Sequence, residues 1–348
     1  MGKIKAFFER KNVTVSLKRY GIDALGAMAQ GLFASLLIGT ILDTIGAQLG
    51  VDILCQIASY AKAVTGVAMA IAIGYALQCP PLVLFSLAAV GQAANVLGGA
   101  GGPLAVYVVA TIAAEAGKIV SKETKVDIIV TPIVTIGVGV LLSIWCAPHI
   151  GNAASAVGGA IMWATELQPF LMGILVSVFV GVALTLPISS AAICAALGLT
   201  GLAGGAAVAG CCAQMVGFAV MSFRENRWGG LLAQGLGTSM LQMGNIVRNP
   251  RIWIAPTLAS AITGPIATCL FHLEMNGPAV SSGMGTCGMV GPIGVYTGWI
   301  SSGVAITAMH WVGLGLIAIV LPAVLTWVFG NICRKIGWIR ENDLKLDL

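Results

Sequence analysis

The amino-acid sequence predicts an all-α protein that crosses a membrane about ten times. Of its 348 residues, 58% are hydrophobic and only 9% are charged, whereas about 25% of the residues of an ordinary soluble domain are charged. The mean hydropathy is +0.96, and so few charged side chains do not cover a soluble fold of this size. We therefore expect lipid to solvate much of the surface. Glycine, which occurs 46 times, allows helices in lipid to pack closely.

The chain begins with a basic segment at residues 1–20, in which Lys and Arg alternate with apolar residues. This segment is too long for the positively charged start of a cleavable signal peptide. Its composition is typical of an amphipathic segment that lies on the membrane surface.

Ten apolar segments follow that are long enough, or nearly so, to span a bilayer, which takes about 20 residues. The predicted spans are 21–46, 63–79, 81–101, 103–119, 126–147, 168–186, 188–204, 205–223, 252–271 and 303–330.

The distribution of Lys and Arg predicts the orientation of these spans, because cytoplasmic loops carry an excess of both residues. Five basic clusters are separated by even numbers of predicted spans, which places every cluster and both termini in the cytoplasm of a multi-pass protein of the cell (plasma) membrane. The clusters are 3–19, 118–125, 224–227, 248–251 and 334–345.

Two Gly-rich segments, 229–247 and 275–301, start and end on the same side of the membrane in this topology. Both are moderately apolar and contain scattered polar residues. Non-helical backbone at membrane depth survives only where protein or a watery cavity satisfies its polar groups. We interpret both segments as re-entrant hairpins that enter from opposite faces; surface helices or plain loops are the alternative.

A weak internal repeat supports this organisation. When the chain is shifted by 107 residues, eight of 29 positions starting at Ala63 are identical. Both copies end at a basic loop, which indicates a direct repeat within a single membrane domain covering 1–348. Within that domain we expect repeat 1 at 21–120, repeat 2 at 124–227, and the hairpins with the last spans at 228–335.

Polar residues at the predicted hairpins are the candidate solute-binding groups, because ionisable side chains in a membrane are costly and are functional candidates by default. Glu274 ends a long apolar span and opens the second hairpin, with His272 and Asn276 beside it. The first hairpin ends in Gln242, Asn245 and Asn249, whose amides are expected to face the same cavity.

Other polar residues have simpler explanations. Glu115 lies one turn before Lys118 and is expected to pair with it, and Gln214 is expected to link helices rather than to bind a ligand. His149 and His310 are two of only three histidines, and neither has a partner at a spacing that indicates a metal site.

Several classes of function have no support in the sequence. The nine cysteines include no C-x-x-C pair, so neither a metal nor a disulfide is expected. No Walker loop or dinucleotide-binding motif occurs, and the net charge of +5 is too small to suggest nucleic-acid binding. We expect no cofactor, and we expect a transport protein rather than an enzyme.

Three segments carry a resemblance to a known family: LKRYGIDALGAMAQGLFASLLIGTIL (17–42), NPRIWIAPTLASAITGPIAT (249–268) and NGPAVSSGMGTCGMVGPIGVYTGW (276–299). Together with the basic amphipathic start, they resemble the EIIC-type membrane proteins of the sugar phosphotransferase system. They are most similar to the compact toxin-regulator (PfoR-like) branch, and the resemblance covers nearly the whole chain.

The resemblance implies ten spans with two re-entrant hairpins, a homodimer, and elevator-like movement of a substrate-carrying unit. It also implies sugar binding by a Glu and a His near the hairpins, for which Glu274 and His272 are the nearest matches. The glucose-type sequence G-I-T-E-P is missing, and the chain has no phosphocarrier domain. Phosphotransfer would therefore need separate EIIA and EIIB partners.

The leading hypothesis is a transporter component that moves a small polar, sugar-like solute by alternating access. A membrane sensor or regulator that keeps the fold without transport is the first alternative. An ion-coupled transporter or channel for a different solute is the second.

Overall fold

The computed structural model describes residues 2–346, which form helices and no strand, as the sequence predicts. These residues divide into two compact units. The first unit contains the residues up to Gly39 and Ser59–Ala153, and the second contains Thr40–Ala58 and the residues from Ala154 onward.

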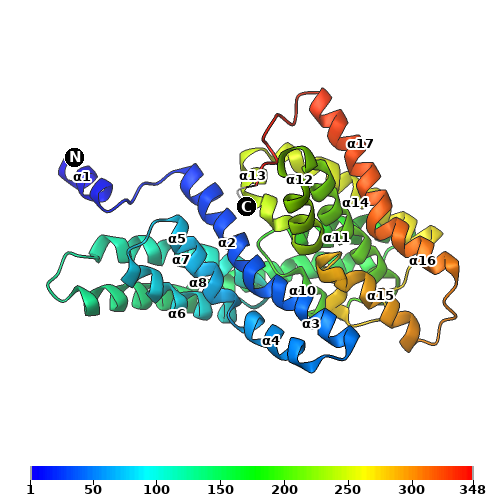
Figure 1. The fold of residues 1–348 in the computed structure, drawn as a ribbon, viewed down its shortest axis with the longest axis horizontal. Helices are drawn as coiled ribbons and strands as arrows, with labels where there is room; N and C mark the ends of the chain where they lie inside the picture. The colour runs from blue at the N-terminus through cyan, green and yellow to red at the C-terminus, as the bar shows by residue number, and fades with distance from the viewer. Residues whose placement is uncertain (1, 347–348) are drawn as a thin grey trace. The chain divides into compact units, whose positions relative to one another are not determined.

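The first unit is built from helices that precede residue 154 (Figure 1). Three helices, α3, α4 and α8, have residues in both units. The helices are α1 (Gly2–Arg10), α2 (Leu25–Leu32), α3 (Ile38–Leu49), α4 (Asp52–Ala63), α5 (Thr65–Ala76), α6 (Pro81–Gly98), α7 (Gly102–Val120) and α8 (Asp127–Thr165), with π-helical turns at Lys18–Ala24 and Phe33–Leu37 and a 3₁₀ turn at Gly99–Gly101.

Helices α6 and α7 form an antiparallel hairpin in the first unit. The chain reverses at Gly99, whose φ of +49° suits a residue without Cβ. A Cβ on Gly98 would lie 2.8 Å from the Cβ of Ala105, so the two helices approach closely just after the turn. Helix α8 packs against both helices. A Cβ on Gly117 of α7 would overlap Thr135 of α8, and a Cβ on Gly139 of α8 would overlap Val90 of α6.

The second unit contains the remaining helices. They are α9 (Pro169–Thr185), α10 (Ser190–Ala196), α11 (Gly201–Met221), α12 (Phe223–Leu232), α13 (Met243–Arg248), α14 (Ile254–Pro265), α15 (Val290–Ser301), α16 (Ala308–Gly315) and α17 (Leu321–Lys335). Short π-helical or 3₁₀ segments connect them at Ala233–Gly237, Ser239–Gln242, Pro250–Trp253, Ile266–Leu270, Ala279–Gly283, Cys287–Met289 and Leu316–Val320.

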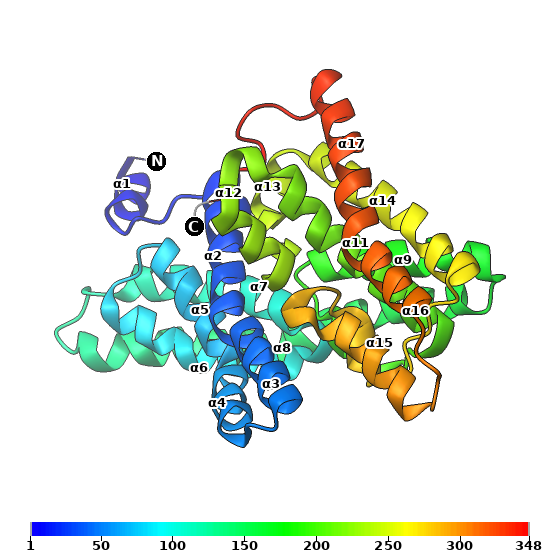
Figure 2. The same ribbon diagram turned by 45° about the vertical axis from the view of Figure 1, so that its right-hand side comes forward.

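Helix α11 is the centre of the second unit and packs against α9, α14 and α17 (Figure 2). Of the most apolar stretch of 18 residues in α11, 94% is buried inside the protein. Its glycines permit this crowding, because Cβ atoms on Gly205 and Gly210 would overlap the backbone oxygens of Leu273 and Ser177. Close approach through small residues is the way helices associate without a hydrophobic force between them.

Six helical segments are long and apolar enough to cross a membrane, or seven if α4 and α5, bent by 51°, form one span. One of the six, Pro81–Val120, comprises both helices of the α6–α7 hairpin. Helix α9 is apolar but has only 17 residues. The helices indicate a multi-pass membrane protein.

Two expected segments differ from the structure. Residues 188–204 are not one span: α10 ends at Ala196, and the chain turns with positive φ at Gly198 and at Gly201, the first residue of α11. The predicted span 126–147 is too short: the helix that it belongs to, α8, continues as far as Thr165, through most of the interval before the next predicted span. Pro148 lies inside this helix without ending it.

The segment 275–301 folds as a hairpin. Its first arm is extended and 3₁₀-helical, its second arm is α15, and Gly285, Gly288 and Met289 turn with positive φ between them. The arms touch through glycine, because a Cβ on Gly298 would lie 2.7 Å from the backbone nitrogen of Gly277.

The segment 229–247 also folds back on itself. Gln242 on its second arm donates a hydrogen bond of 2.9 Å to Gln234 on its first. The turn Ala233–Gly237 of this hairpin contacts the turn Cys287–Met289 of the other. The two hairpins therefore meet at their tips inside the second unit.

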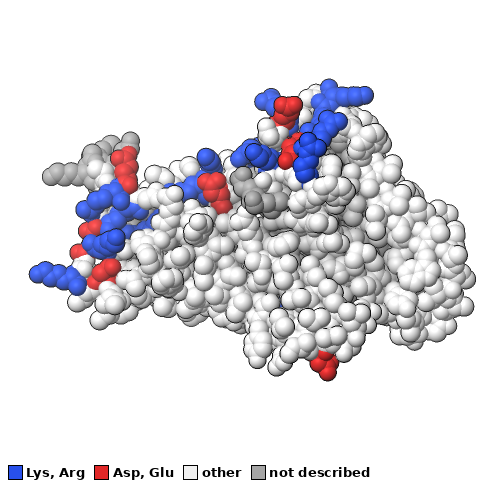
Figure 3. All heavy atoms as spheres, viewed as in Figure 1, with Lys and Arg blue, Asp and Glu red and all other residues white. Residues whose placement is uncertain are grey.

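Charged side chains gather at the edges of each unit. In Figure 3 the basic residues of the second unit cluster where α12, α13 and the end of α17 lie, while the rest of the face in view is almost free of charge. This separation is the one expected for a protein whose apolar belt faces lipid.

Candidate functional site

A cavity of about 270 Å³ lies at the entrance to the second hairpin. It brings together Glu274, His272 and Asn276, the three neighbouring residues that the sequence singles out. The lining also includes Trp299 from α15 and His310 from α16.

A two-residue alternation positions the polar groups of this cavity. His272 turns the chain with a left-handed φ of +44°, and from Leu273 onward side chains alternate between the core and the outside. Leu273 and Met275 are 3% and 0% exposed and pack in the core, whereas His272 and Glu274 face outward. The backbone of Met275 pairs with Gly201 through two hydrogen bonds of 2.9 Å, which fixes this register.

Hydrogen bonds orient the side chains in the cavity. Asn276 Nδ2 donates to Glu274 Oε2 at 2.9 Å, so the carboxylate keeps its second oxygen for another donor. His310 Nδ1 accepts from the backbone nitrogen of Thr307 at 3.1 Å in a capping box at the start of α16. The His310 ring meets Trp299 edge to face, with ring centroids 5.2 Å apart.

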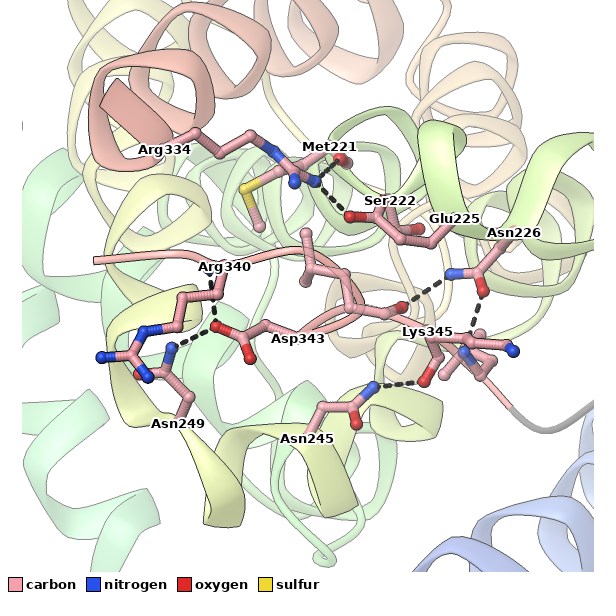
Figure 4. Close-up of polar contacts among 12 residues, drawn as sticks. Met221, Ser222, Glu225, Asn226, Asn245, Asn249, Arg334, Arg340, Asp343 and Lys345 are labelled. Carbon is pink, nitrogen blue, oxygen red and sulfur yellow. Dashed lines mark hydrogen bonds and ion pairs between the residues drawn. The ribbon is translucent and has the colours of Figure 1, made fainter. Parts of the chain in front are cut away.

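The amides of the first hairpin do not line this cavity. Gln242, Asn245 and Asn249 instead bind the C-terminal segment 337–346, which we call the tail (Figure 4). Gln242 Nε2 donates to the carbonyl of Leu344 at 3.0 Å, and Asn245 Nδ2 donates to that of Lys345 at 2.8 Å. Helix α13 lies toward one end of the second unit and α15 toward the other (Figures 1 and 2).

Further contacts secure the tail. Asn226 donates to the carbonyl of Leu344 and accepts from the backbone nitrogen of Leu346, at 2.7 and 2.8 Å. Asn249 Nδ2 donates to Asp343 Oδ2 at 2.7 Å. Ile339 and Leu344 are 3% and 0% exposed, in a cluster beneath the tail. The tail thus occupies the donors that the sequence assigns to a solute.

A second polar cluster surrounds Gln214 on α11, which is fully buried. Its Oε1 accepts from Trp253 Nε1 at 2.9 Å, and Thr185 lies 3.3 Å away. Thr185 Oγ1 is 2.7 Å from Ser239 Oγ at the tip of the first hairpin. Gln214 therefore links α9, α11 and the segment before α14, as expected for a residue that joins helices.

A charged cluster lies in the first unit. Glu115 Oε2 is 2.7 Å from Lys118 Nζ, which confirms the pairing expected from their spacing, and Glu115 Oε1 is 3.4 Å from Arg19 Nε. Lys118 also donates to the backbone oxygens of Asn12 and Leu77. These contacts attach the N-terminal segment to α7.

The described residues offer little for metal or redox chemistry. Among residues 2–346, no group of three or more His, Cys, Asp and Glu side chains is arranged to hold a metal ion. All nine cysteines are free.

The sequence predicts the three cavity residues that are neighbours in the chain, but it does not predict the two that come from later helices. His310 is visible in the sequence only as a rare residue without a partner, and Trp299 gives no signal at all. Both enter the cavity because α15 and α16 fold back over the segment 270–276.

The long apolar helices and the paired hairpins are those of a multi-pass membrane protein. The chain matches the family Phosphotransferase system, EIIC over residues 22–346, and it belongs to that family. EIIC domains are the membrane transport subunits of sugar phosphotransferase systems, are not catalytic by themselves, and work with EIIA and EIIB phosphocarriers. No curated protein and no solved structure matches the chain.

Proposed function

We propose that this EIIC protein carries a small polar, sugar-like solute across the cell membrane and that the cavity around Glu274 binds it. The observation that supports this proposal is the meeting of a carboxylate, an amide and two imidazoles beside the ring of Trp299. Binding sites commonly combine an apolar wall with a few convergent polar groups.

Each group has a defined role in this proposal. The free oxygen of Glu274 accepts hydrogen bonds from solute hydroxyls, and Asn276 and His272 supply further polar contacts. Trp299 is only 4% exposed, so it contributes a fixed apolar edge to the cavity wall. A cavity of about 270 Å³ is near the lower limit of the usual ligand pocket, which favours a small solute.

The first hairpin supplies the opposite side of the path in this proposal. Gln242, Asn245 and Asn249 bind the solute after the tail leaves them, and an elevator-type movement carries the site from one face to the other. We further propose ten spans with the hairpins re-entering from opposite faces, a direct repeat, a homodimer, and cytoplasmic termini. Phosphorylation of the solute is then carried out by separate partner proteins.

The test is binding and uptake with a matched pair of variants. Purified protein is screened by thermal stabilisation against sugars, polyols, organic acids and ions, since a ligand of the folded state raises stability. Glu274→Gln should weaken binding of the active compound about 10- to 100-fold, because a charged hydrogen bond is worth about 1.5–3 kcal/mol. Glu166→Gln, which changes an exposed acid outside the cavity, should have no effect. Failure to bind or to transport any compound in liposomes contradicts the proposal.

A sensor or regulator is the second candidate, favoured by the tail that occupies the hairpin amides. In that case the solute binds at Glu274 but does not cross the membrane. Uptake into proteoliposomes by the chain shortened after Lys335 separates the two, since a transporter should move solute and a sensor should not.

A further inference from the structure

A groove between α12 and α17 lies outside the proposed solute path. Two adjoining cavities, of about 360 and 620 Å³, form it and share Arg224, Trp327, Asn331 and Arg334. Trp228 lines one end of the groove and Lys335 the other.

The groove carries positive charge that the protein does not neutralise. Arg334 Nη2 pairs with Glu225 at 2.8 Å and donates to the carbonyl of Met221 at 3.1 Å. Arg224 and Lys335 are exposed and form no ion pair with any residue in the described part of the chain, 2–346. Two cations thus remain for an external anion.

The walls of the groove are apolar and aromatic. Trp228 and Trp327 are 69% and 59% exposed, and Val328 and Ile332 add aliphatic surface. Gly330 lies at the bottom of the groove and packs closely on Met221, because a Cβ there would lie 2.8 Å from the Met221 side chain. A groove of this kind is poorly suited to a fully hydrated anion.

The position of the groove indicates where its ligand comes from. Helix α17 ends a segment long and apolar enough to cross a membrane, Ala308–Lys335, and only 33% of its most apolar window is buried in the protein. Trp together with Lys and Arg at the end of such a helix marks the level of lipid headgroups. The apolar walls of the groove therefore continue into the acyl region.

We propose that this groove binds one anionic phospholipid. Its phosphate contacts Arg224 and Lys335, Asn331 donates to a headgroup oxygen, and an acyl chain lies along Trp327 and Val328. A zwitterionic lipid fits less well, because no acid lines the groove and Glu225, which pairs with Arg334, is only 7% exposed. A bound lipid would hold α12, which leads into the first hairpin, against α17.

The experiment measures thermal stability of the full-length protein in detergent while phosphatidylglycerol, phosphatidylcholine or inorganic phosphate is added. Phosphatidylglycerol should raise the melting temperature saturably, and the other two should not. The double variant Arg224→Gln/Lys335→Gln should bind phosphatidylglycerol about 10- to 30-fold more weakly, at roughly fivefold per basic residue. Trp327→Ala should also weaken the lipid effect.

The matched control removes two cations of the same basic face that do not line the groove, Arg248→Gln/Arg251→Gln. This variant should respond to phosphatidylglycerol as the unchanged protein does. Equal losses in both double variants would reduce the effect to general surface charge and overturn the proposal. A shift with inorganic phosphate alone would indicate a free-anion site instead, and no shift with phosphatidylglycerol would exclude the lipid site.

Discussion

The tail should detach when its buried anchor is shortened. Leu344 is fully buried and packs with Phe218, Ile246 and Ile339. Truncating a buried Leu to Ala costs about 2–5 kcal/mol. The tail lies near the surface and adjusts to the lost methyl groups, so the lower part of that range, about 2–3 kcal/mol, applies. Leu344→Ala should therefore raise the detached fraction roughly 30- to 150-fold.

Limited trypsin digestion measures this fraction. Arg340 is exposed, but the tail around it is held by hydrogen bonds and by its buried side chains. When opening and closing are fast, the cleavage rate follows the population of the open form. Cleavage after Arg340, followed by intact mass, should accelerate by the same factor, while the melting temperature of the remaining protein changes little.

The matched control is Ile336→Ala, which removes a similar apolar group at the end of α17 from a side chain that is 58% exposed. Its cleavage rate should equal that of the unchanged protein. Unchanged cleavage in Leu344→Ala would refute the conclusion that burial of this residue holds the tail. A large fall in melting temperature would instead show that the tail is an inseparable part of the core.

Three further outcomes are expected. Gly210→Ala should destabilise the protein by about 1–3 kcal/mol or more in chemical unfolding, because the new methyl group overlaps a backbone oxygen of α9, whereas Gly315→Ala, with open space around it, should not. Glu115→Gln leaves two largely buried cations without their acid and should cost about 3–5 kcal/mol. Glu123→Gln changes a carboxylate that is 37% exposed and should change the melting temperature little. A hydrogen bond from Lys11, above all, lowers the pKa of Glu123 below its ordinary value of 4.5. A lowered pKa stabilises above the ordinary value, so the protection of amides near Lys11 from hydrogen exchange, taken relative to the intrinsic rate at each pH, should stay constant near neutral pH and should fall as pH drops below 4.5 through the lowered pKa.

The general architecture could be predicted because it depends on local composition. Long apolar segments require helices when no water is present to satisfy the backbone, and most expected spans coincide with observed helices within a few residues. The prediction of one span at 188–204 was wrong, because two glycines in this apolar segment, Gly198 and Gly201, adopt positive φ and interrupt the helix. An apolar composition predicts that a segment is buried in protein or lipid, but it does not predict whether the segment forms one unbroken helix.

The candidate site was predictable only where its residues are neighbours in sequence. Glu274, His272 and Asn276 lie within five consecutive residues just after a helix end, so their clustering follows from their spacing, although the left-handed turn at His272 could not be foreseen. His310 and Trp299 join them through tertiary packing that no sequence period announces. The amides of the first hairpin were assigned to a solute because amides bind hydroxyls, yet they equally bind peptide carbonyls, and the tail supplies these from about 100 residues further along the chain.

The glycines that support the internal repeat have different partners in the two halves of the chain. A Cβ on Gly66 would overlap the backbone of Gly91, whereas its counterpart under the 107-residue shift, Gly173, faces Gly264 on α14. Gly181 in turn faces Gly210 on α11. Any close helix crossing favours glycine at the contact position. Identical glycines in the two halves therefore do not require that the halves descend from a common ancestor. A repeat of common origin should therefore be sought in matched turns and crossing angles rather than in matched glycines.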